Sequence, residues 1–462
     1  PSELMERENT LSKLRKIVKL MGYLPLQTPS LELAETLLGA QYNDDSLKEL
    51  YGFNGPENID MALRYEFTLS LARYVASNPT LALPFRCYQY GNVWRVDKPG
   101  PGRYREFMQF DIDIVGTNNL LADAEIIAVM VTTFENLGIK NFEVRFSSRK
   151  ILNGLIEWAG IPDEKGPDVM RVLDKFEKQG RGAVLQELGE GRIDKSGDKI
   201  KGLNLPQSQI GKIEEFARSA LERDVGSNNL PNPLEWVENN LLDFEEARKG
   251  IEELKLIQEY LKNMNIPSSK ADIDLTIVRG LGYYTGTVYE TILNDLPEYG
   301  SVFSGGRYDN LVNRFSGQSI PGVGASIGID RLLAALFELK AVKKKQAVSE
   351  VLVTVMDKDR LPDYLKILKN LRDEQIASEI YCGDSNNLTR QIKYADKSGI
   401  PFAVIAGSDE FDNNKVTVKN LSVGREKAQQ TSDRKEWLKA EEMQETIPAK
   451  DLIAYLKNHL DK

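Results

Sequence analysis

Apolar residues near the N-terminus recur with the spacing of a helix. Intervals of three, four or seven residues separate Leu4, Leu11, Leu14, Val18 and Met21. This spacing places them on one side of an amphipathic helix, which we expect to end at Gly22. Residues 23–31 then form an extended segment that contains Pro25 and Pro29. Because proline cannot donate a ladder hydrogen bond, we expect this segment at a sheet edge or an interface.

The next apolar runs change to the period of strands. Residues 85–95 and 106–115 flank a loop rich in proline and glycine, so the pattern predicts an antiparallel hairpin. A helix is predicted for residues 120–137 and a strand for residues 142–146.

Residues 161–266 are rich in Lys, Glu, Leu and Gln with helical spacing, which predicts a largely helical insertion. Strand and loop chemistry resumes at Asp272. We therefore expect residues 1–160 and 267–340 to form one discontinuous domain with a shared sheet.

The C-terminal part has a separate alternation of short strands and helices. Residues 341–349 are a predicted linker, and residues 350–462 a compact α/β domain. In order, the pattern predicts strand, helix, strand, helix, strand and strand at residues 351–355, 364–371, 378–381, 388–398, 402–406 and 415–419.

The second strand of the predicted hairpin has one polar and one apolar face. With a side-chain period of two, Phe107, Gln109, Asp111 and Asp113 share a face, while the opposite face is apolar. Polar alternation alone favours an outer strand facing solvent. The neighbouring arginine-rich loop favours the alternative, in which the polar face lines a cavity.

Residues 277–290 combine an arginine with three glycines, three tyrosines and two threonines, which no ordinary core strand needs. Glycine allows a ligand to approach the backbone, tyrosine offers a flat apolar body with a polar tip, and Arg279 supplies a permanent cation. The segment predicts a site for an anion beside a small polar group.

Further cations surround the hairpin loop, at Arg95, Lys98, Arg103 and Arg105. On spacing alone these would be surface charges. Arg95, however, follows Trp94 in a strand-like run, where an unpaired guanidinium would be costly, so it is expected to meet an anion or a carboxylate. Phosphate best accounts for several converging arginines.

Two glycine-rich segments could add backbone contacts to a nucleotide. Residues 322–331 resemble a dinucleotide fingerprint, but the third glycine is one residue late and the acidic ribose partner is missing. The alternative is close packing of a strand on a helix, with Arg331 in its first turn. Residues 304–309 bring Arg307 and Tyr308 close by, although a plain glycine turn also explains them.

The composition narrows the chemistry. The chain has 462 residues, 41% hydrophobic and 28% charged, as expected for a soluble protein of about two to four domains. Two cysteines favour a reducing compartment, and the lack of a long apolar run argues against a membrane span. A single histidine argues against a Ser-His-Asp triad or a multi-histidine metal site.

The net charge of -9 does not decide whether nucleic acid binds. The chain begins at Pro1, so we expect that a leader or some native residues are missing.

Across nearly its whole length the chain resembles the histidyl-tRNA synthetases, which are class II aminoacyl-tRNA synthetases. The first helix and Pro29 resemble motif 1, residues 94–109 motif 2 and residues 322–331 motif 3. Residues 278–286 and 305–309 resemble the two histidine-specific signatures of the family. Residues 391–399 resemble part of its anticodon-binding domain.

The resemblance implies α/β and α+β architecture: an antiparallel class II sheet with flanking helices, a helical insertion and a C-terminal α/β anticodon-binding domain. It implies an aminoacyl-tRNA synthetase that uses ATP and Mg²⁺ to convert L-histidine to histidyl-adenylate and pyrophosphate, then transfers histidine to the 3′ end of tRNA(His). A cytoplasmic homodimer, joined through motif 1, is also implied. The alternatives are a non-catalytic synthetase-like regulatory subunit that binds histidine, and a synthetase for another amino acid.

The resemblance also implies roles for single residues. Arg95 would hold the α-phosphate, Arg279 would neutralise its developing charge, and Arg103 and Arg331 would engage the outer phosphates. The substrate's amino group is assigned to Glu66, Thr68 and Gln109, the imidazole to Asp113 and Tyr284, and further histidine contacts to Tyr283 and Tyr308. No resident metal is expected.

Some positions depart from the family pattern. Met108 stands where histidine is frequent and Gly282 where aspartate is frequent, and the segment at residues 42–62 is shorter than is common in the family.

In the C-terminal domain the candidates for reading bases are Asn387, Arg390, Gln391 and Lys393. The helical insertion is expected to contact the acceptor arm of the tRNA.

Overall fold

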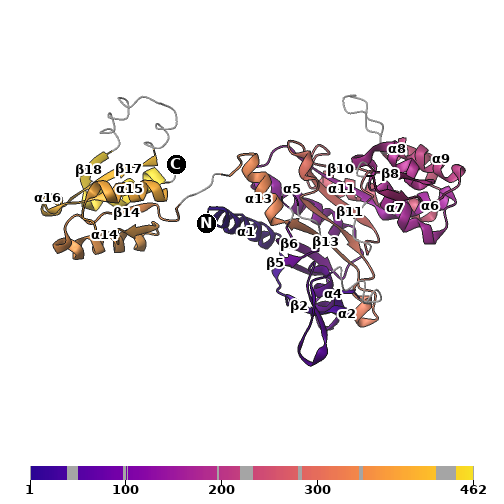
Figure 1. The fold of residues 1–462 in the computed structure, drawn as a ribbon, viewed down its shortest axis with the longest axis horizontal. Helices are drawn as coiled ribbons and strands as arrows, with labels where there is room; N and C mark the ends of the chain where they lie inside the picture. The colour runs from indigo at the N-terminus through magenta and orange to yellow at the C-terminus, as the bar shows by residue number, and fades with distance from the viewer. Residues whose placement is uncertain are drawn as a thin grey trace. The chain divides into compact units, whose positions relative to one another are not determined.

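The computed structural model describes residues 2–38, 50–96, 100, 102, 104–194, 197–218, 233–278, 283–342, 347–422 and 444–460. The chain divides into two compact units, residues 9–342 and residues 343–462 together with 1–8 (Figure 1). Among the described helices, none is both long and apolar enough to cross a lipid bilayer.

An eight-stranded sheet forms the centre of the larger unit. Its order is β1-β5-β6-β13-β12-β11-β7-β10, with antiparallel pairing from β5 to β7 and a parallel strand at each edge. The bounds are β1 Leu24–Pro25, β5 Phe85–Trp94, β6 Glu106–Val115, β13 Gly322–Gly328, β12 Phe303–Tyr308, β11 Thr287–Leu293, β7 Phe142–Ser148 and β10 Ala271–Ile273. The predicted hairpin is confirmed as β5 and β6, and the proline-containing segment lies at the sheet edge as β1.

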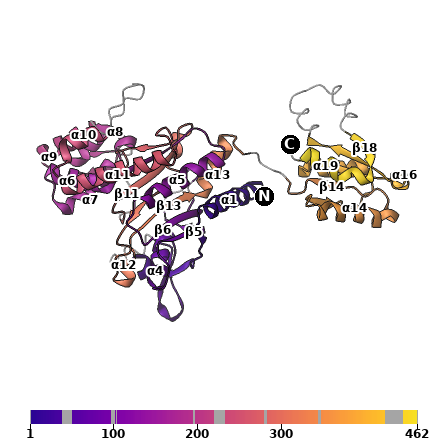
Figure 2. The ribbon, with the colours of Figure 1, turned by 180° about the vertical axis from the view of Figure 1, so that it is seen from behind.

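One face of this sheet packs on helices. The apolar sides of α1, α5 and α13 join Phe110, Ile112 and Ile114 of β6 in one hydrophobic core, and the three helices lie along the sheet in both views (Figures 1 and 2). They span α1 Ser2–Leu20, α5 Leu121–Asn136 and α13 Ile329–Glu338, and the short helix η5 Pro297–Tyr299 lies between β11 and β12 in sequence. The apolar alternation of β6 therefore marks the face that is buried against helices.

The opposite face is partly covered by a smaller layer. Helix α4, with α12, packs on Phe85, Cys87 and Val115 through a second apolar cluster. A three-stranded sheet, β2-β4-β3, lies beside α2. The bounds are α4 Thr68–Ala76, α12 Asn313–Ser316, α2 Ala34–Leu38, β2 Leu31–Leu33, β3 Gly52–Asn54, η2 Pro56–Asn58 and β4 Asp60–Leu63.

In its described residues the insertion is helical apart from the short hairpin β8–β9, as its periodicity predicts. It returns to the sheet through α11, which packs closely on α6: a Cβ at Gly154 would lie 2.4 Å from the Cβ of Ala247. Its core continues that of the sheet. Helix α6 Arg149–Ala159 precedes the insertion, whose elements are η3 Asp163–Lys165, α7 Gly166–Leu173, α8 Phe176–Leu188, β8 Gly191–Ile193, β9 Lys199–Lys201, α9 Gln207–Phe216, α10 Pro233–Leu241 and α11 Glu245–Asn263.

The C-terminal unit is a five-stranded sheet with helices. Its order is β15-β14-β16-β17-β18, parallel across β15, β14 and β16 and antiparallel beyond. The bounds are β14 Val351–Val353, η6 Lys358–Arg360, α14 Leu361–Asp373, β15 Ser378–Ile380, α15 Leu388–Ser398, β16 Phe402–Ile405, α16 Ser408–Asp412, β17 Lys415–Asn420, β18 Gln444–Pro448, η8 Ala449–Asp451 and α19 Leu452–Leu460. The six predicted elements are present in the predicted order, but the short helices η6 and α16 interrupt it and were not predicted, and β18 and α19 lie beyond the predicted elements.

Candidate active site

The polar face of β6 is buried. Gln109 is 7% exposed, and Asp111 and Asp113 are each 3% exposed. Because β6 lies between β5 and β13, it is an inner strand, and the interpretation as an outer strand facing solvent is wrong. Burying two carboxylates side by side is costly unless partners or a ligand compensate, so this face is a candidate binding surface.

Glycine on β13 makes room for one of these carboxylates. Gly324 is the register partner of Asp113, and a Cβ at Gly324 would lie 2.0 Å from Asp113 Oδ1 and 2.6 Å from the Ile112 carbonyl oxygen. Residues 322–328 thus form a central strand leading into α13. A dinucleotide turn is excluded, and the alternative of a strand followed by a packed helix is correct.

Asp113 has an aromatic surrounding. The Tyr308 hydroxyl donates to Asp113 Oδ1 at 2.7 Å. Tyr283 stacks edge-on against Tyr284 and Tyr308, with ring centroids 5.0 Å and 6.2 Å away. Burial raises the pKa of Asp113 to about 7, the Tyr308 hydrogen bond opposes the rise, and the Glu66 carboxylate adds to it. A carboxylate among flat rings suits a small planar group that carries an N–H.

Glu66 is fixed at the start of α4. Its carboxylate accepts hydrogen bonds from the backbone N–H groups of Thr68 at 3.0 Å and Leu69 at 2.7 Å, and from the Tyr283 hydroxyl at 3.0 Å. Burial, followed by the charge of Glu66, raises the pKa of the Tyr283 phenol well above its usual range, so this hydroxyl remains a donor. The three contacts hold a negative charge beside the tyrosines and Asp113.

Gln109 presents one satisfied and one unsatisfied end. Its Nε2 donates to Ser326 Oγ at 2.9 Å, while its buried Oε1 has no hydrogen-bond partner among the described residues. Most buried polar atoms have partners, so an orphan acceptor indicates a ligand that donates. Together, Gln109 and Glu66 offer acceptors suited to a cation.

Two of the four predicted phosphate-binding arginines can be placed. Arg95 Nε donates to the Tyr65 carbonyl oxygen at 3.0 Å, and its guanidinium carbon lies 5.2 Å from the Phe107 ring centroid. Arg331 lies in the first turn of α13, and its Nη1 donates to the Ser301 carbonyl oxygen at 2.7 Å. Arg103 and Arg279 lie outside the described residues.

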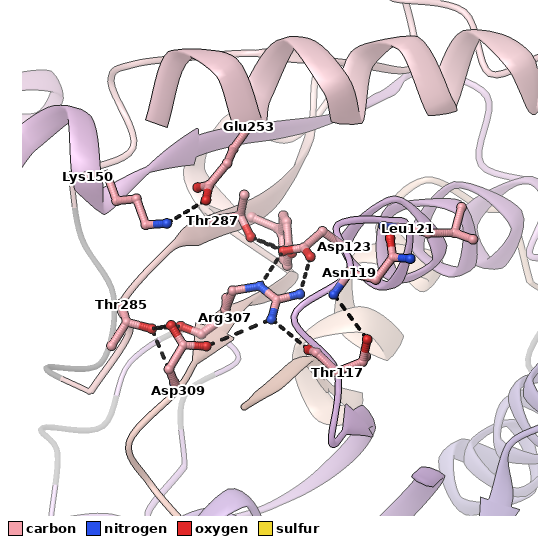
Figure 3. A network of polar contacts seen from close by, with 11 residues as sticks. Thr117, Asn119, Leu121, Asp123, Lys150, Glu253, Thr285, Thr287, Arg307 and Asp309 are labelled. Carbon is pink, nitrogen blue, oxygen red and sulfur yellow. Dashed lines mark hydrogen bonds and ion pairs between the residues drawn. The ribbon is translucent and has the colours of Figure 1, made fainter. Parts of the chain in front are cut away.

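Arg307 has a different role from the one that a nucleotide pocket would give it. It is 4% exposed, forms a buried ion pair with Asp123 of α5, and donates to the Thr117 carbonyl oxygen at 2.9 Å (Figure 3). The hydroxyls of Thr287 and Tyr289 also donate to Asp123. The guanidinium is therefore used inside the fold and does not support a nucleotide pocket, and because residues 303–308 form strand β12, the alternative of a plain glycine turn is wrong as well.

Two of the four candidates for base reading in the C-terminal unit have structural roles. Gln391 is buried, donates to the carbonyl oxygens of Val355 and Ser385, and accepts from the Val355 N–H. Asn387 caps α15 by accepting from the Arg390 N–H at 3.1 Å. Arg390 and Lys393 remain exposed beside the exposed Tyr394 ring.

Two polar residues next to the site were given no role from the sequence. Asp111 lies on the predicted polar face, and Ser326 is its register partner on β13. Alternation along β6 could have indicated Asp111. Nothing in the sequence around Ser326 reveals that it meets Asp111, because the two residues belong to strands far apart in the chain.

Comparison with known proteins agrees with this architecture. Residues 1–332 match the family model of histidyl-tRNA synthetase, and residues 350–459 match that of an anticodon-binding domain. A histidine–tRNA ligase of Dinoroseobacter shibae is 40% identical over 98% of this chain and 93% of the relative.

Solved structures show the same likeness. The crystal structure of histidyl-tRNA synthetase from Nostoc sp. PCC 7120 has a TM-score of 0.81 and 30% identity, and covers 99% of this chain and 96% of that one. A structure described as an ATP phosphoribosyltransferase regulatory subunit/histidyl-tRNA synthetase from Bacillus halodurans has a TM-score of 0.67, covers 85% of this chain and 93% of that one, and at 22% identity shows the fold alone. The predicted fold class and the resemblance are confirmed: the chain belongs to the histidyl-tRNA synthetase family.

Proposed function

We propose that this chain is a histidine–tRNA ligase, which activates L-histidine with ATP and transfers it to the 3′ end of tRNA(His). The observation that carries the proposal is a pair of buried polar side chains on the same face of β6. Asp113 lies among tyrosines, and Gln109, four residues earlier, has a side-chain oxygen without a hydrogen-bond partner among the described residues. An amino acid with an imidazole side chain supplies the groups that both ends need.

Histidine fits the site through two groups, its cationic ammonium and the N–H of its imidazole ring. Its ammonium would be received by Gln109 Oε1 and the Glu66 carboxylate, with Thr68 beside them. Its ring N–H would be accepted by Asp113, with Tyr284 serving the second nitrogen and the Tyr283 and Tyr308 rings forming the walls. A buried acceptor left unpaired penalises amino acids without that N–H, which separates histidine from apolar competitors.

The activation step requires no histidine side chain of the enzyme. An amino-acid carboxylate is already ionised at neutral pH, so attack on the α-phosphate needs positioning and charge neutralisation rather than a general base. Arg95 and Arg279 are assigned to the α-phosphate, and Arg103 and Arg331 to the outer phosphates. Each preorganised donor of this kind is typically worth about 3 to 4 kcal/mol of transition-state stabilisation.

Mg²⁺ would arrive on the ATP phosphates. The ion usually takes most of its ligands from phosphates and water, with one or two carboxylates from the protein. Glu290 fits as such a ligand because it is the register partner of Ser304, which pairs with Ser326, so its carboxylate lies in the same row of the sheet face as Asp111. The ion's chemistry would be to neutralise phosphate charge.

A second copy of the chain is the proposed partner at motif 1. Several large apolar side chains around α1, β1, β2 and the start of β5 are exposed, Leu20 by 89%, and the others are Leu24, Leu31, Leu33, Leu83 and Tyr90. Large apolar side chains exposed along one segment of the fold are of the kind that an interface covers. A homodimer through this surface accounts for them, and both free cysteines fit a cytoplasmic location.

tRNA(His) is the proposed macromolecular substrate. The match of residues 350–459 to an anticodon-binding domain supports contact with the anticodon, for which Arg390 and Lys393 are the exposed candidates on α15. The helical insertion is the proposed contact for the acceptor arm.

The alternative, a regulatory subunit that binds histidine, is less well supported. Such a paralogue typically loses the arginine signature or the C-terminal domain, whereas Arg95, Arg279, Arg331 and the anticodon-binding domain are all present here. The likeness to the Bacillus halodurans structure shows the fold alone and does not favour it.

Amino-acid-dependent exchange of pyrophosphate into ATP tests the proposal. Wild-type protein should show exchange with histidine among the twenty amino acids, and Arg95→Ala and Arg279→Ala should lose it. Arg86→Ala is a matched control. Arg86 lies on β5, the strand that precedes Arg95, but its guanidinium pairs with Glu125 at 2.8 Å. Absence of exchange with every amino acid, together with measurable histidine binding, would move the assignment to the regulatory subunit.

A further inference from the structure

Three polar side chains form a hydrogen-bonded chain across β6 and β13. Gln109 Nε2 donates to Ser326 Oγ at 2.9 Å, and the Ser326 hydroxyl donates to Asp111 Oδ1. Ser326 and Asp111 are register partners, and Gln109 precedes Asp111 by two residues on the same face. The chain therefore runs along the wall of the proposed histidine site.

The direction of this chain follows from the Ser326 hydroxyl donating to Asp111. Asp111 Oδ1 accepts when the carboxyl group is ionised or carries a proton on its other oxygen, and a proton on Oδ1 itself would reverse the chain. A hydroxyl has one hydrogen, so Ser326, having given it to Asp111, can only accept from Gln109. The amide must then turn its NH₂ group to Ser326 and its Oε1 in the other direction.

The neighbouring Gln89 offers the Gln109 amide no free oxygen, although the buried Nε2 of Gln89 has no hydrogen-bond partner among the described residues. Gln89, the register partner of Asp111 on β5, has its own oxygen occupied by the Thr28 hydroxyl at 2.9 Å. Asp111 is nearly fully buried, which restricts its rotation. Burial, followed by the neighbouring Asp113 carboxylate, raises the pKa of Asp111, and the Ser326 hydrogen bond opposes this rise.

We propose that Asp111 and Ser326 are positioning residues that hold the Gln109 amide with its oxygen toward the substrate ammonium. The inference rests on the proposed function, in which Gln109 receives the amino group of histidine. With the amide reversed, an NH₂ donor would face the ammonium donor and the contact would become repulsive. Fixing the orientation before binding removes that state and its entropy cost.

The test compares histidine with imidazolepropionate, which has the ring and the carboxylate but no amino group. Binding of each is measured by calorimetry to wild-type protein and to Ser326→Ala. We expect histidine affinity to fall about tenfold in the variant, because Gln109 loses its fixed orientation, and imidazolepropionate affinity to stay within about twofold. A purely structural role would weaken both ligands equally.

Two further variants keep the test informative if Ser326→Ala folds poorly. Ser326→Thr retains the hydroxyl and should restore most of the histidine affinity. Asp111→Asn introduces an NH₂ group that can donate to Ser326 and permit the reversed chain, so it should weaken histidine selectively. Thr291→Val is a matched control, since it removes a buried hydroxyl without a partner among the described residues from the core-facing side of the same sheet.

The outcomes separate the inference from the function beneath it. Equal losses for both ligands, or unchanged histidine affinity in Ser326→Ala and Asp111→Asn, would overturn the positioning role while leaving the proposed function intact. Wild-type protein that binds histidine no better than imidazolepropionate would overturn the proposed role of Gln109. Wild-type protein that binds neither ligand would overturn the proposed function.

Discussion

Two adjacent residues of β12, Arg307 and Tyr308, lie on opposite faces of one sheet and have opposite roles. Arg307 closes a buried network with Asp123 and the Thr117 carbonyl oxygen, beneath α5. Tyr308 reaches the other face and donates to Asp113, whose pKa burial raises to about 7. Both faces contain buried charge, and in the described contacts the charge on the Arg307 face is a cation paired with an anion.

The difference shows how a structural charge can be told from a functional one. A buried ion pair with saturated hydrogen bonds has nothing left to offer a ligand. The Asp113 face instead keeps several carboxylates close together and an unpaired amide oxygen, an arrangement whose cost a cationic or N–H-bearing ligand would offset. The signature at residues 305–309 therefore serves both purposes, one on each side of the strand.

The largest expected effect is on the Arg307 face. Arg307→Met should lower the free energy of unfolding by about 3 to 5 kcal/mol, because it leaves the Asp123 carboxylate buried without its cation. Urea unfolding would measure this loss. The histidine KM of the folded protein should be unchanged, and Arg307→Met combined with Asp123→Leu should recover part of the stability. A raised histidine KM at wild-type stability would place Arg307 in the site after all.

Gly324→Ala should act on the other face. The new Cβ would meet Asp113 Oδ1 and the Ile112 carbonyl oxygen, and relieving such an overlap typically costs about 1 to 3 kcal/mol. Because Asp113 must move, we expect histidine affinity to fall by about 10- to 100-fold in a calorimetric titration. Gly328→Ala on the same strand is the control, as its Cβ would come no closer than 3.9 Å to Arg331 Cβ. Similar losses in both variants would contradict the proposed crowding of Asp113.

Asp113→Asn should change histidine binding by a similar factor, but with a distinct pH dependence and without the steric overlap. Losing a hydrogen bond to a charged group typically costs about 1.5 to 3 kcal/mol, so histidine KM should rise by roughly 10- to 100-fold above pH 7. In wild-type protein the pKa of Asp113 is raised to about 7 by burial, so the carboxylate forms, and KM falls, as pH rises through that value. The variant should lack this component and keep only the titration of histidine itself. An unchanged profile would remove Asp113 from imidazole recognition.

Stability should change in the opposite direction for the same substitution. A folded-state pKa above the ordinary carboxyl value means that the protonated form stabilises the fold at low pH, and that this contribution is lost as pH rises through about 7. Asn carries no such charge. Relative to wild-type protein, Asp113→Asn should therefore gain stability between pH 5 and pH 8, which thermal unfolding at the two pH values would measure.

Local periodicity predicted the parts of the fold that depend on neighbours in sequence. Alternation along residues 106–115 was sufficient for the strand, its two faces and the hairpin with residues 85–95, because the side-chain period and a short loop set them. The pairing of Asp113 with Gly324, and the meeting of Arg307 with Asp123, depend on register between distant segments, which no local pattern encodes. The roles of Glu66, Gln109 and Asp113 came from family resemblance, and they remain proposals.

The position of β13 between β6 and β12 also matters while the chain is being made. β6 ends at Val115 and its partner strand begins at Gly322, so about 200 residues must leave the ribosome before β6 can pair on that side. At roughly 5 to 20 residues per second, β6 would wait on the order of 10 to 40 s with an open strand edge. An unpaired edge beside an apolar face is prone to aggregation. Nascent chains that stall within the helical insertion should therefore depend most on chaperones.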